Sequence, residues 1–283
     1  MSNNADIDLN GYTLTLNNVV RVSTEGAENS IVVKFQNGTI KSKTMANYNK
    51  PALDHNAIEL YNKSSLTLDK VNLDSDLGGI FAVNYESDIT LTLNESVVTA
   101  GGNYGLSTNA STKNGPLSNN IIFKITKSKV KMIETATAGD NLAICFNVGG
   151  HVEINDSDII ADRQGILLRT GETHKISNTT ISATGKNNTD KEYLSGNWSG
   201  GNEVPLAALV IGNRSASYKL GTTAFLDNVT LNTPEKNSAE KTYFDMYIYQ
   251  NDERYPVSVT LTGNKPSKIN QEASRNGASY VIK

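Results

Sequence analysis

The chain has 283 residues and a net charge of −3, and small polar residues dominate its composition. Asn, Thr and Ser number 35, 27 and 25, close to a third of the chain, while apolar residues make up 37%. This composition argues against a helical bundle, because these three residues are poor in helix interiors. The low net charge argues against intrinsic disorder. No basic patch points to nucleic acid, and no apolar run approaches the roughly 20 residues of a membrane-spanning helix.

The two ends of the sequence and its cysteine usage bear on the cellular compartment. The N-terminal residues Met1 to Asn4 lack the charged and apolar regions of a signal peptide. Cys145 is the only cysteine, so the chain has no internal disulfide. Because the composition is typical of extracellular bacterial proteins, we expect an extracellular or cell-surface location with the signal peptide removed.

Two short units recur along the chain. The first has the pattern hydrophobe, x, polar, small, x, hydrophobe, and its copies lie at 35–41, 68–74, 93–99, 125–131, 154–160, 176–182 and 226–232. The second begins with Gly or Ala and ends near an Asn, and its copies lie at 57–62, 79–84, 105–110, 143–147, 165–170, 209–213 and 245–250. Such a repeat, with shortest spacings of 22 and 23 residues, predicts a solenoid.

One repeat reads as three short strands, illustrated by residues 80–100. The segment 80–83 is a first strand, 89–93 a second and 97–100 a third, with a tight bend at Asn94 to Ser96. In the second strand Ile89, Leu91 and Leu93 alternate with threonines, which predicts an inward and an outward face. About 22 residues suffice for one turn of a parallel β-helix. An antiparallel β-sandwich also has short strands at regular spacing, but it does not explain a repeated three-strand unit.

The recurring asparagines need a structural explanation. Asn tolerates the left-handed backbone that sharp corners require. We expect Asn62, Asn84, Asn147 and Asn213 to stack and to hydrogen-bond from coil to coil, rather than to bind a ligand.

With these units in view, the chain resembles the right-handed parallel β-helix, or pectate-lyase-like, superfamily. The opening Asp6-Ile-Asp-Leu-Asn-Gly-Tyr-Thr-Leu-Thr-Leu is similar to the first coils of bacterial surface members of the adhesin type. The resemblance implies an all-β right-handed parallel β-helix with three sheets and about eight to ten coils. The paired aspartates and the Gly-His-Gly and Arg-Ile-Lys motifs of the superfamily's polygalacturonases are missing from this sequence.

The sequence predicts a single domain with two caps. We expect an N-terminal cap and first strand at 1–30, a parallel β-helix at 31–265 and a C-terminal cap at 266–283. Inserted loops are expected at 107–120, 132–141, 185–205 and 234–243. Caps matter because an open end is an edge that invites aggregation.

The resemblance implies that ligands bind the outer face of the first sheet. Alternation places Glu59, Tyr61, Phe81, Val83, Cys145, Leu167, Arg169, Val210, Asp245, Tyr247 and Tyr249 on that face. It is more apolar than a solvated sheet face, so either inserted loops cover it or it binds a partner. Tyr193 and Trp198 in loop 185–205 suit stacking on a sugar. The predicted ligand-binding residues are Tyr61, Phe81, Arg169, Tyr193, Trp198, Tyr247 and Tyr249.

Catalytic groups are harder to assemble. Glu59 and Asp245 lie some six coils apart, roughly 29 Å at the usual strand spacing, too far to cooperate as a glycosidase pair. Arg163, Arg169 and His174 are the nearest basic set for a lyase, although exposed residues on coil edges are the favoured interpretation. His55, His151 and His174 lack metal-ligand spacing. We expect no metal and no cofactor, and the sequence does not support a calcium site.

The sequence therefore predicts a non-catalytic surface protein, an adhesin or a glycan-binding module. The alternatives are a polysaccharide lyase or glycoside hydrolase of the same fold, and a structural or protein-interaction stalk. The expected partners are a polysaccharide or a host glycan or protein, with no nucleic acid and no membrane span. An oligomer through the apolar face of the first sheet is a further expectation.

Overall fold

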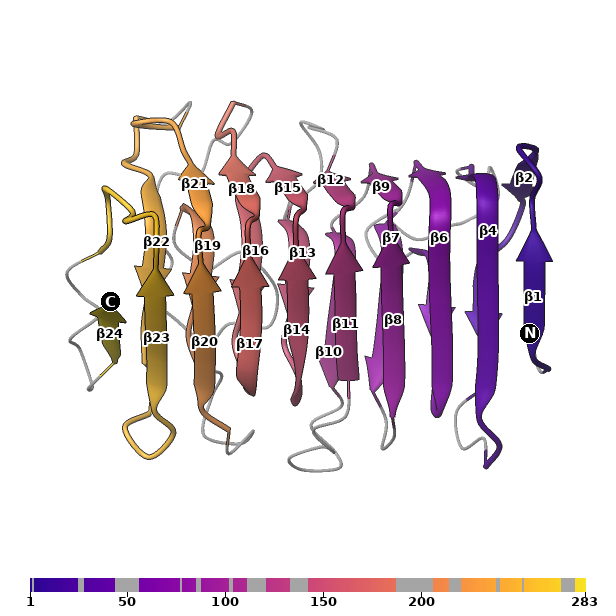
Figure 1. Cartoon of the computed structure of the whole chain (residues 1–283), viewed down its shortest axis with the longest axis horizontal. Coiled ribbons are helices and arrows are strands. Elements are labelled where there is room, and N and C mark those ends of the chain that lie inside the picture. Colours follow the sequence, from indigo (N-terminus) through magenta and orange to yellow (C-terminus); the bar gives the residue numbers. More distant parts are fainter. Residues whose placement is uncertain are drawn as a thin grey trace.

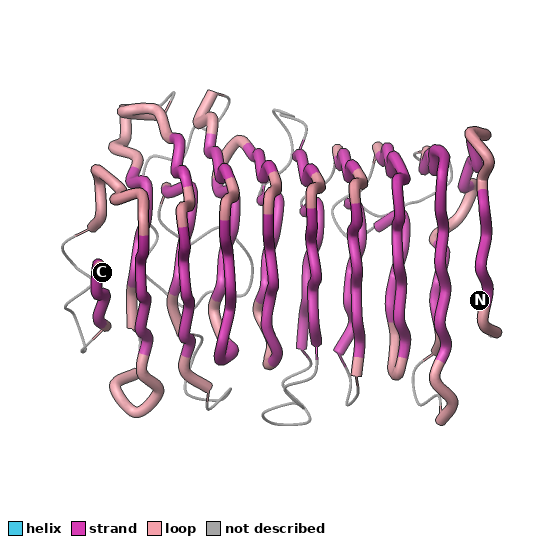
Figure 2. Tube along the Cα trace, viewed as in Figure 1, coloured by secondary structure: helices cyan, strands magenta, loops and turns pink. Residues whose placement is uncertain are grey.

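The computed structural model describes residues 1, 3–24, 28–43, 56–76, 78–84, 88–101, 104–110, 121–132, 142–186, 206–213, 220–237, 240–250, 252–270 and 278–283. All regular structure in these ranges is β-strand (Figure 2). They therefore contain no helix long and apolar enough to cross a membrane.

The strands form two sheets in which every ladder is parallel. Sheet A has eight strands, namely β3 (Val20–Val22), β5 (Asn56–Leu60), β7 (Gly78–Asn84), β10 (Tyr104–Ala110), β13 (Leu142–Phe146), β16 (Gln164–Leu168), β19 (Ala207–Ile211) and β22 (Phe244–Ile248). The second sheet has 16 strands and divides into two arms, which we call faces B and C. The 12-residue strands β4 (Ile31–Ser42) and β6 (Ser64–Ser75) belong to both faces.

The remaining strands belong to one face each. Face B contains β1 (Ala5–Asp8), β8 (Ile89–Asn94), β11 (Ile121–Thr126), β14 (Gly150–Asn155), β17 (Gly171–Ser177), β20 (Thr222–Asp227), β23 (Val257–Thr262) and β24 (Ser279–Ile282). Face C contains β2 (Thr13–Leu16), β9 (Val97–Ala100), β12 (Lys129–Met132), β15 (Asp158–Ala161), β18 (Thr180–Ala183) and β21 (Thr230–Asn232).

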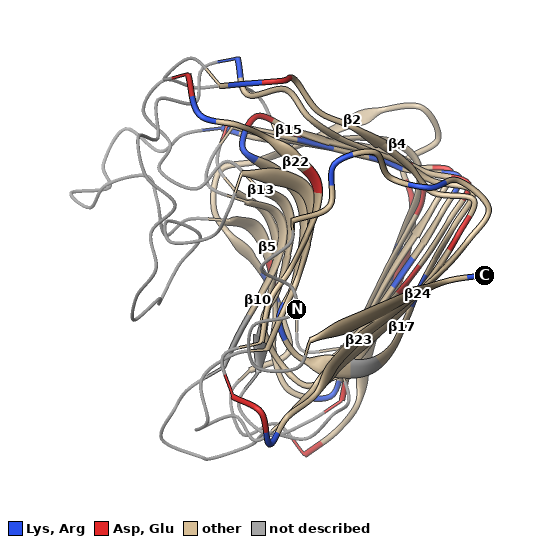
Figure 3. Ribbon diagram, turned by 90° about the vertical axis from the view of Figure 1, so that its left-hand side faces the viewer, with Lys and Arg blue, Asp and Glu red and all other residues tan. Residues whose placement is uncertain are grey.

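The chain visits face B, face C and sheet A in turn, and each circuit, or coil, stacks on the previous one (Figure 1). Seen along the stack, the strands surround a central interior (Figure 3). This solenoid-like arrangement of parallel strands agrees with the three-strand repeat predicted from the sequence. A purely antiparallel sandwich is excluded.

Alternation along the strands fills the interior with apolar side chains. In β8, Ile89, Leu91 and Leu93 are fully buried, whereas Thr90 and Thr92 lie on the outer side. Sheet A differs, because all five positions of β5, β13, β16 and β19 are buried. Sheet A is therefore covered on its outer side as well as its inner side.

Small residues line the corner where each coil enters sheet A. Gly79, Gly105 and Gly165 occupy positions in register with Ala57, Ala143 and Ala208. A Cβ on Gly79 would lie 2.2 Å from the Gly105 carbonyl oxygen, and one on Gly105 would lie 2.6 Å from the Ala143 carbonyl oxygen. The Gly or Ala that opens the second repeated unit is thus a packing requirement.

The bend between faces B and C has the same geometry in seven coils. Its first residue has a positive φ of 45–55°, and the residues concerned are Asn37, Lys70, Glu95, Lys127, Asp156, Asn178 and Asn228. The next residue is the small one of the first repeated unit. Where it carries a hydroxyl, it bonds to the neighbouring coil: the N–H groups of Ser96, Ser128 and Ser157 donate to the hydroxyls of Ser128, Ser157 and Thr179 at 3.0, 3.1 and 3.4 Å.

The predicted asparagine stack needs correction. Phe146 pairs with Leu168, so Asn147 lies beside Arg169 and one position before the column that contains Asn62 and Asn213. The Asn147 side chain accepts a hydrogen bond from Arg169 Nε and donates one to Cys145 Sγ. Coil-to-coil amide bonds also occur at the B–C bend, where Asn228 Nδ2 donates to Asn178 Oδ1 at 3.1 Å.

The two ends of the stack expose their last strands. β1 pairs with β4 and β24 pairs with β23. Near the C-terminal end, the amide of Asn270 accepts from the Ile248 N–H at 2.8 Å and donates to the Ile248 carbonyl at 3.2 Å. This side chain therefore occupies the place of a further strand beside β22. The predicted boundaries of the two caps stay predictions.

Candidate functional site

The outward row of sheet A holds most of the residues predicted to bind a ligand. Strand register aligns Glu59, Phe81, Ser107, Cys145, Leu167, Val210 and Tyr247. Cys145, Leu167 and Val210 in the middle of this row are at most 1% exposed and form an apolar cluster with Leu142 and Ala207. The single chain covers the middle of the row, so only its two ends reach the surface.

At the C-terminal end of the row, three aromatic side chains gather on and after β22. Phe244, Tyr247 and Tyr249 are half-buried and pack against the apolar cluster. The ring centroids of Phe244 and Tyr247 are 5.5 Å apart, and those of Tyr247 and Tyr249 are 6.5 Å apart. Phe244 was not among the predicted residues, although it precedes the strand positions that were.

At the N-terminal end, a charged cluster surrounds Tyr61. Arg21 Nε lies 2.9 Å from Glu59 Oε2, and the Tyr61 hydroxyl donates to the same carboxylate oxygen at 3.2 Å. The Arg21 guanidinium also lies 5.9 Å from the centre of the Tyr61 ring. Phe81 follows in the next coil and is half-buried. Tyr61 and Phe81 are thus accessible at this end.

The two candidate arginines are buried, so the expectation that they are exposed on coil edges was wrong. Arg169 is 1% exposed, and its Nε donates to Asn147 Oδ1 at 2.6 Å. Arg163 is 2% exposed and precedes β16. Its carbonyl oxygen accepts from the Tyr243 hydroxyl at 3.0 Å. Both arginines belong to the packing of sheet A.

His174 lies inside the stack on β17. Its Nδ1 accepts the Val152 N–H at 3.1 Å, its Nε2 lies 2.9 Å from the Thr170 carbonyl oxygen, and its ring packs edge-on against Phe146. These partners fit a neutral ring protonated on Nε2. Burial lowers the pKa of His174 to about 4. The ring does not reach the surface, where a substrate could meet it.

Asp245 does not lie on the outward row, which corrects the alternation argument. Because Leu209 pairs with Met246, Asp245 falls in register with Ala208, in the column of small inward residues. Its carboxylate accepts from Thr233 Oγ1 and Ser267 Oγ, both at 2.7 Å, and from the Lys268 N–H at 2.9 Å. Burial alone would raise its pKa, but these hydrogen bonds lower it below the usual value. Asp245 closes the last coils of the stack.

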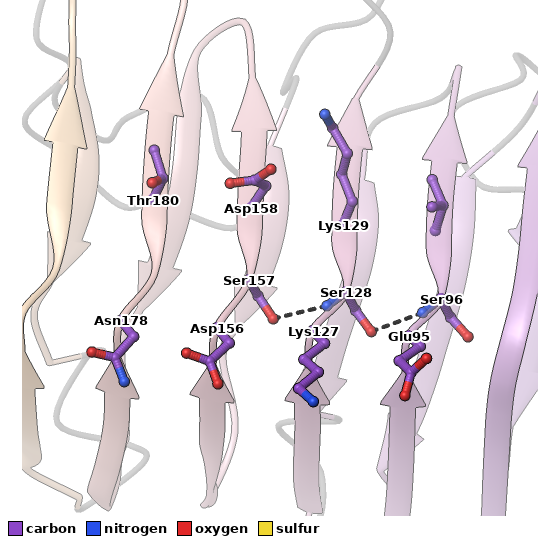
Figure 4. Close-up of a pocket in the computed structure, with 11 residues that line it drawn as sticks. Glu95, Ser96, Lys127, Ser128, Lys129, Asp156, Ser157, Asp158, Asn178 and Thr180 are labelled. Atoms are coloured by element: carbon purple, nitrogen blue, oxygen red, sulfur yellow. Dashed lines mark hydrogen bonds between the residues drawn. The ribbon is translucent and has the colours of Figure 1, made fainter.

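A groove runs across the coils along the B–C bend (Figure 4). It has a volume of ≈ 410 Å³. One wall is the row Glu95, Lys127, Asp156 and Asn178, the other wall is the row Val97, Lys129, Asp158 and Thr180, and the floor is Ser96, Ser128 and Ser157. Since neighbouring coils are about 4.8 Å apart, four coils give a groove roughly 14 Å long.

Charge changes sign from coil to coil along this groove. One coil contributes Lys127 and Lys129, and the next contributes Asp156 and Asp158. Within the described ranges, the side chains of the two lysines and of Asp158 have no hydrogen bond or ion pair. Asp156 Oδ2 accepts one hydrogen bond, from Asn155 Nδ2 at 2.7 Å. The lysine and aspartate pairs are visible in successive copies of the sequence repeat. Their position in one groove follows only from the strand register, which the sequence analysis did not assign.

The other predicted residues do not assemble into a site. Tyr193, Trp198 and His55 lie outside the described residues. His151 lies on the outside of β14, with Nε2 3.4 Å from Glu153 Oε1. In the part of the chain that the structure describes, His, Cys, Asp and Glu do not form a group of three that could hold a metal ion.

Comparison with protein-family models, with curated proteins and with solved structures found no match to this chain.

Proposed function

We propose that this chain is a right-handed parallel β-helix with three sheets, and that it acts as a non-catalytic, glycan-binding module of a bacterial cell surface. The direction of winding supports the handedness. In Figure 1 the strands of face B run upward at the front, and successive coils follow one another from right to left. A chain that rises at the front while it advances to the left winds as a right-handed helix. Faces B and C and sheet A correspond to the three strands of the repeat.

The observation that carries the binding function is the aromatic end of sheet A. Phe244, Tyr247 and Tyr249 are half-buried side by side on one outer face. Aromatic rings offer flat apolar surfaces to the C–H faces of a pyranose, and a rim of polar groups supplies hydrogen bonds. The apolar support beneath the rings holds them in place, so little conformational entropy is lost on binding.

The buried basic groups support a non-catalytic role. A lyase needs a base and a cation that reach the substrate. Arg169 is engaged with Asn147 inside the structure, and His174 is enclosed in the core. These groups stabilise the coils on which they lie.

The test is a glycan-array screen of the full chain, with three variants. Tyr247→Ala with Tyr249→Ala tests the aromatic end, and Trp198→Ala tests loop 185–205. Phe225→Ala is the matched control, because Phe225 is 44% exposed on the outside of face B. We expect a defined glycan to bind the wild type and to lose at least about tenfold in affinity, about 1.4 kcal/mol, in the double tyrosine variant.

Three results would contradict the proposal. Binding of no glycan would favour a protein-binding or structural role. An equal loss in Phe225→Ala would place the site elsewhere. Release of cleavage products from a bound polysaccharide would instead indicate a lyase or hydrolase.

A further inference from the structure

The groove along the B–C bend lies away from sheet A and has a distinct chemistry. Its walls project from positions two residues apart on the same coil, such as Lys127 and Lys129. The floor is closed, because the Ser96 and Ser128 N–H groups donate to hydroxyls of the next coil, and the Ser128 and Ser157 hydroxyls donate to carbonyls of their own coil at 2.7 and 2.8 Å. The floor is therefore rigid, and the wall side chains determine which ligands fit.

The wall charges are arranged as a dipole across two neighbouring coils. Lys129 pairs in register with Asp158, and Lys127 and Asp156 occupy equivalent positions of the bend. The backbone positions of the two lysines thus lie about 4.8 Å along the stack from those of the two aspartates, and the Lys127 and Lys129 side chains extend in opposite directions from the bend (Figure 4). Glu95 adds a negative charge on the far side of the lysines, while Asn178 and Thr180 add neutral polar groups beyond the aspartates.

A ligand with one kind of charge fits this arrangement poorly. An anion over the lysines lies between negative coils on both sides, and a cation over the aspartates lies one coil from two lysines. Each of these ions is attracted by the charges of one coil and repelled by the charges of the next. A zwitterion whose charges are separated by about one coil spacing is attracted by the charges of both coils.

We propose that this groove binds a zwitterionic group with an anion and an ammonium about 5 Å apart. The anion, a phosphate or carboxylate, lies over Lys127 and Lys129, and the ammonium lies over Asp156 and Asp158. Such a group occurs as a substituent of glycans and as a lipid headgroup, and both share this chemistry. The inference is independent of the aromatic end of sheet A.

The experiment is isothermal titration calorimetry of the full chain with phosphocholine as the probe, at low ionic strength. Because the charges are exposed, we expect weak binding, with a Kd of about 1 mM. Inorganic phosphate and tetramethylammonium, which are the two halves of the probe, should each bind at least about tenfold more weakly. Vesicles of phosphatidylcholine form a second arm, since binding to vesicles would identify a lipid source and binding to free probe alone a soluble or glycan-linked one.

Variants assign the two halves of the probe. Lys127→Gln with Lys129→Gln, and Asp156→Asn with Asp158→Asn, should each reduce the affinity for phosphocholine at least about tenfold. Lys131→Gln and Asp74→Asn are matched controls, because both residues are exposed on face C outside the groove, and neither should change the affinity. Circular dichroism verifies that each variant folds.

The proposal is overturned by absence of phosphocholine binding at about 20 mM, far above the expected Kd. It is equally overturned if phosphate or tetramethylammonium alone binds as well as the zwitterion. Equal losses in the control variants would show binding elsewhere on the molecule. A failed glycan screen leaves these outcomes unaffected, because the two experiments use different ligands and different variants.

Discussion

Burial and hydrogen bonding determine what the ionisable residues of this molecule do. His174, Arg169 and Asp245 each lie beside partners that fix one charge state and one orientation. The lysines and aspartates of the B–C groove have no such partners on the opposite wall within the described residues. The side chains with a structural role thus differ in their surroundings from those of the proposed zwitterion site.

His174 provides a pH-dependent test at this scale. Its pKa is about 4 in the folded protein, against 6.5 for an unperturbed histidine. Between these values the unfolded chain binds a proton that the folded chain does not, so stability falls as the pH falls from 6.5 to 4. This residue should contribute a loss of about 2 kcal/mol between pH 7.5 and pH 5.

Urea unfolding of the wild type and of His174→Gln at the two pH values measures this loss. Gln does not titrate and retains an acceptor for the Val152 N–H. The variant should be less stable at pH 7.5 but should lose less stability on acidification. An identical pH dependence in both proteins would show that His174 is accessible to protons in the folded state.

Part of this residue-level picture was available in the sequence. Side chains alternate along a strand, so His174, two positions before the inward Ile176, is expected to point inward as well. Lys175 lies between them and points outward. The burial of Arg169 could not be foreseen, because alternation places it outward and only the folded chain shows that this face is covered. Asp245 was misplaced because the extra inward residue at the corner shifts the alternation by one position.

At the scale of strands and bends, the seven B–C bends are the most regular element. In each of these seven coils four residues lie between the last inward residue of face B and the first inward residue of the face C strand, as between Leu93 and Val98 or Ile125 and Val130. Asn occupies only three of the seven positive-φ positions. Lys and Glu adopt the same backbone in other coils because hydrogen bonds between coils hold the bend closed.

Ser128→Ala tests the hydroxyl bonds of this bend. The substitution removes the acceptor of the buried Ser96 N–H and the donor to the Thr126 carbonyl. An unpaired buried N–H costs about 1–3 kcal/mol, so the free energy of unfolding should fall by that amount. Ser182→Ala on the outer side of β18 is the control and should stay within about 0.5 kcal/mol of the wild type. A loss in Ser128→Ala no larger than in this control would contradict the structural role.

The sequence repeat predicted the position of the B–C bends but not their hydrogen bonds. The repeated small residue located the bend in every copy. Its hydroxyl ladder was missed because the same position holds Gly38, Val71 and Val229 in other coils, so the pattern appears as size rather than chemistry. The groove was missed for a similar reason: it depends on residues 22 to 32 positions apart that the register brings side by side.

At the scale of the whole molecule, the two ends of the stack are less well covered than its middle. Tyr280 and Ile282 pair with the buried Val259 and Leu261 but are 39% and 38% exposed. Ile7, which pairs with Phe35 at the other end, is half-buried. Each coil gains its stability from its two neighbours, and the terminal coils have only one.

Hydrogen exchange should therefore proceed inwards from both ends. We expect the amides of β1 and β24 to exchange first and those of β11 and β14 last, because local opening is easiest where few apolar contacts must break. Mass spectrometry of peptides from these strands measures the order. Uniform protection across the four strands would indicate one cooperative unit in place of nearest-neighbour coupling.

Because the bend is constant and only the corners vary in length, the coils of this molecule stack at a constant spacing. Ile58 and Ile80 are 22 residues apart, whereas Ile166 and Leu209 are 43 apart, yet both pairs are neighbours in sheet A. Chain length is therefore absorbed at the corners beside sheet A and never at the bend. Deleting or duplicating one 22-residue repeat changes the reach of the rod by about 4.8 Å. The separation of two binding surfaces on different coils can thus evolve, or be engineered, in whole steps without redesign of either surface.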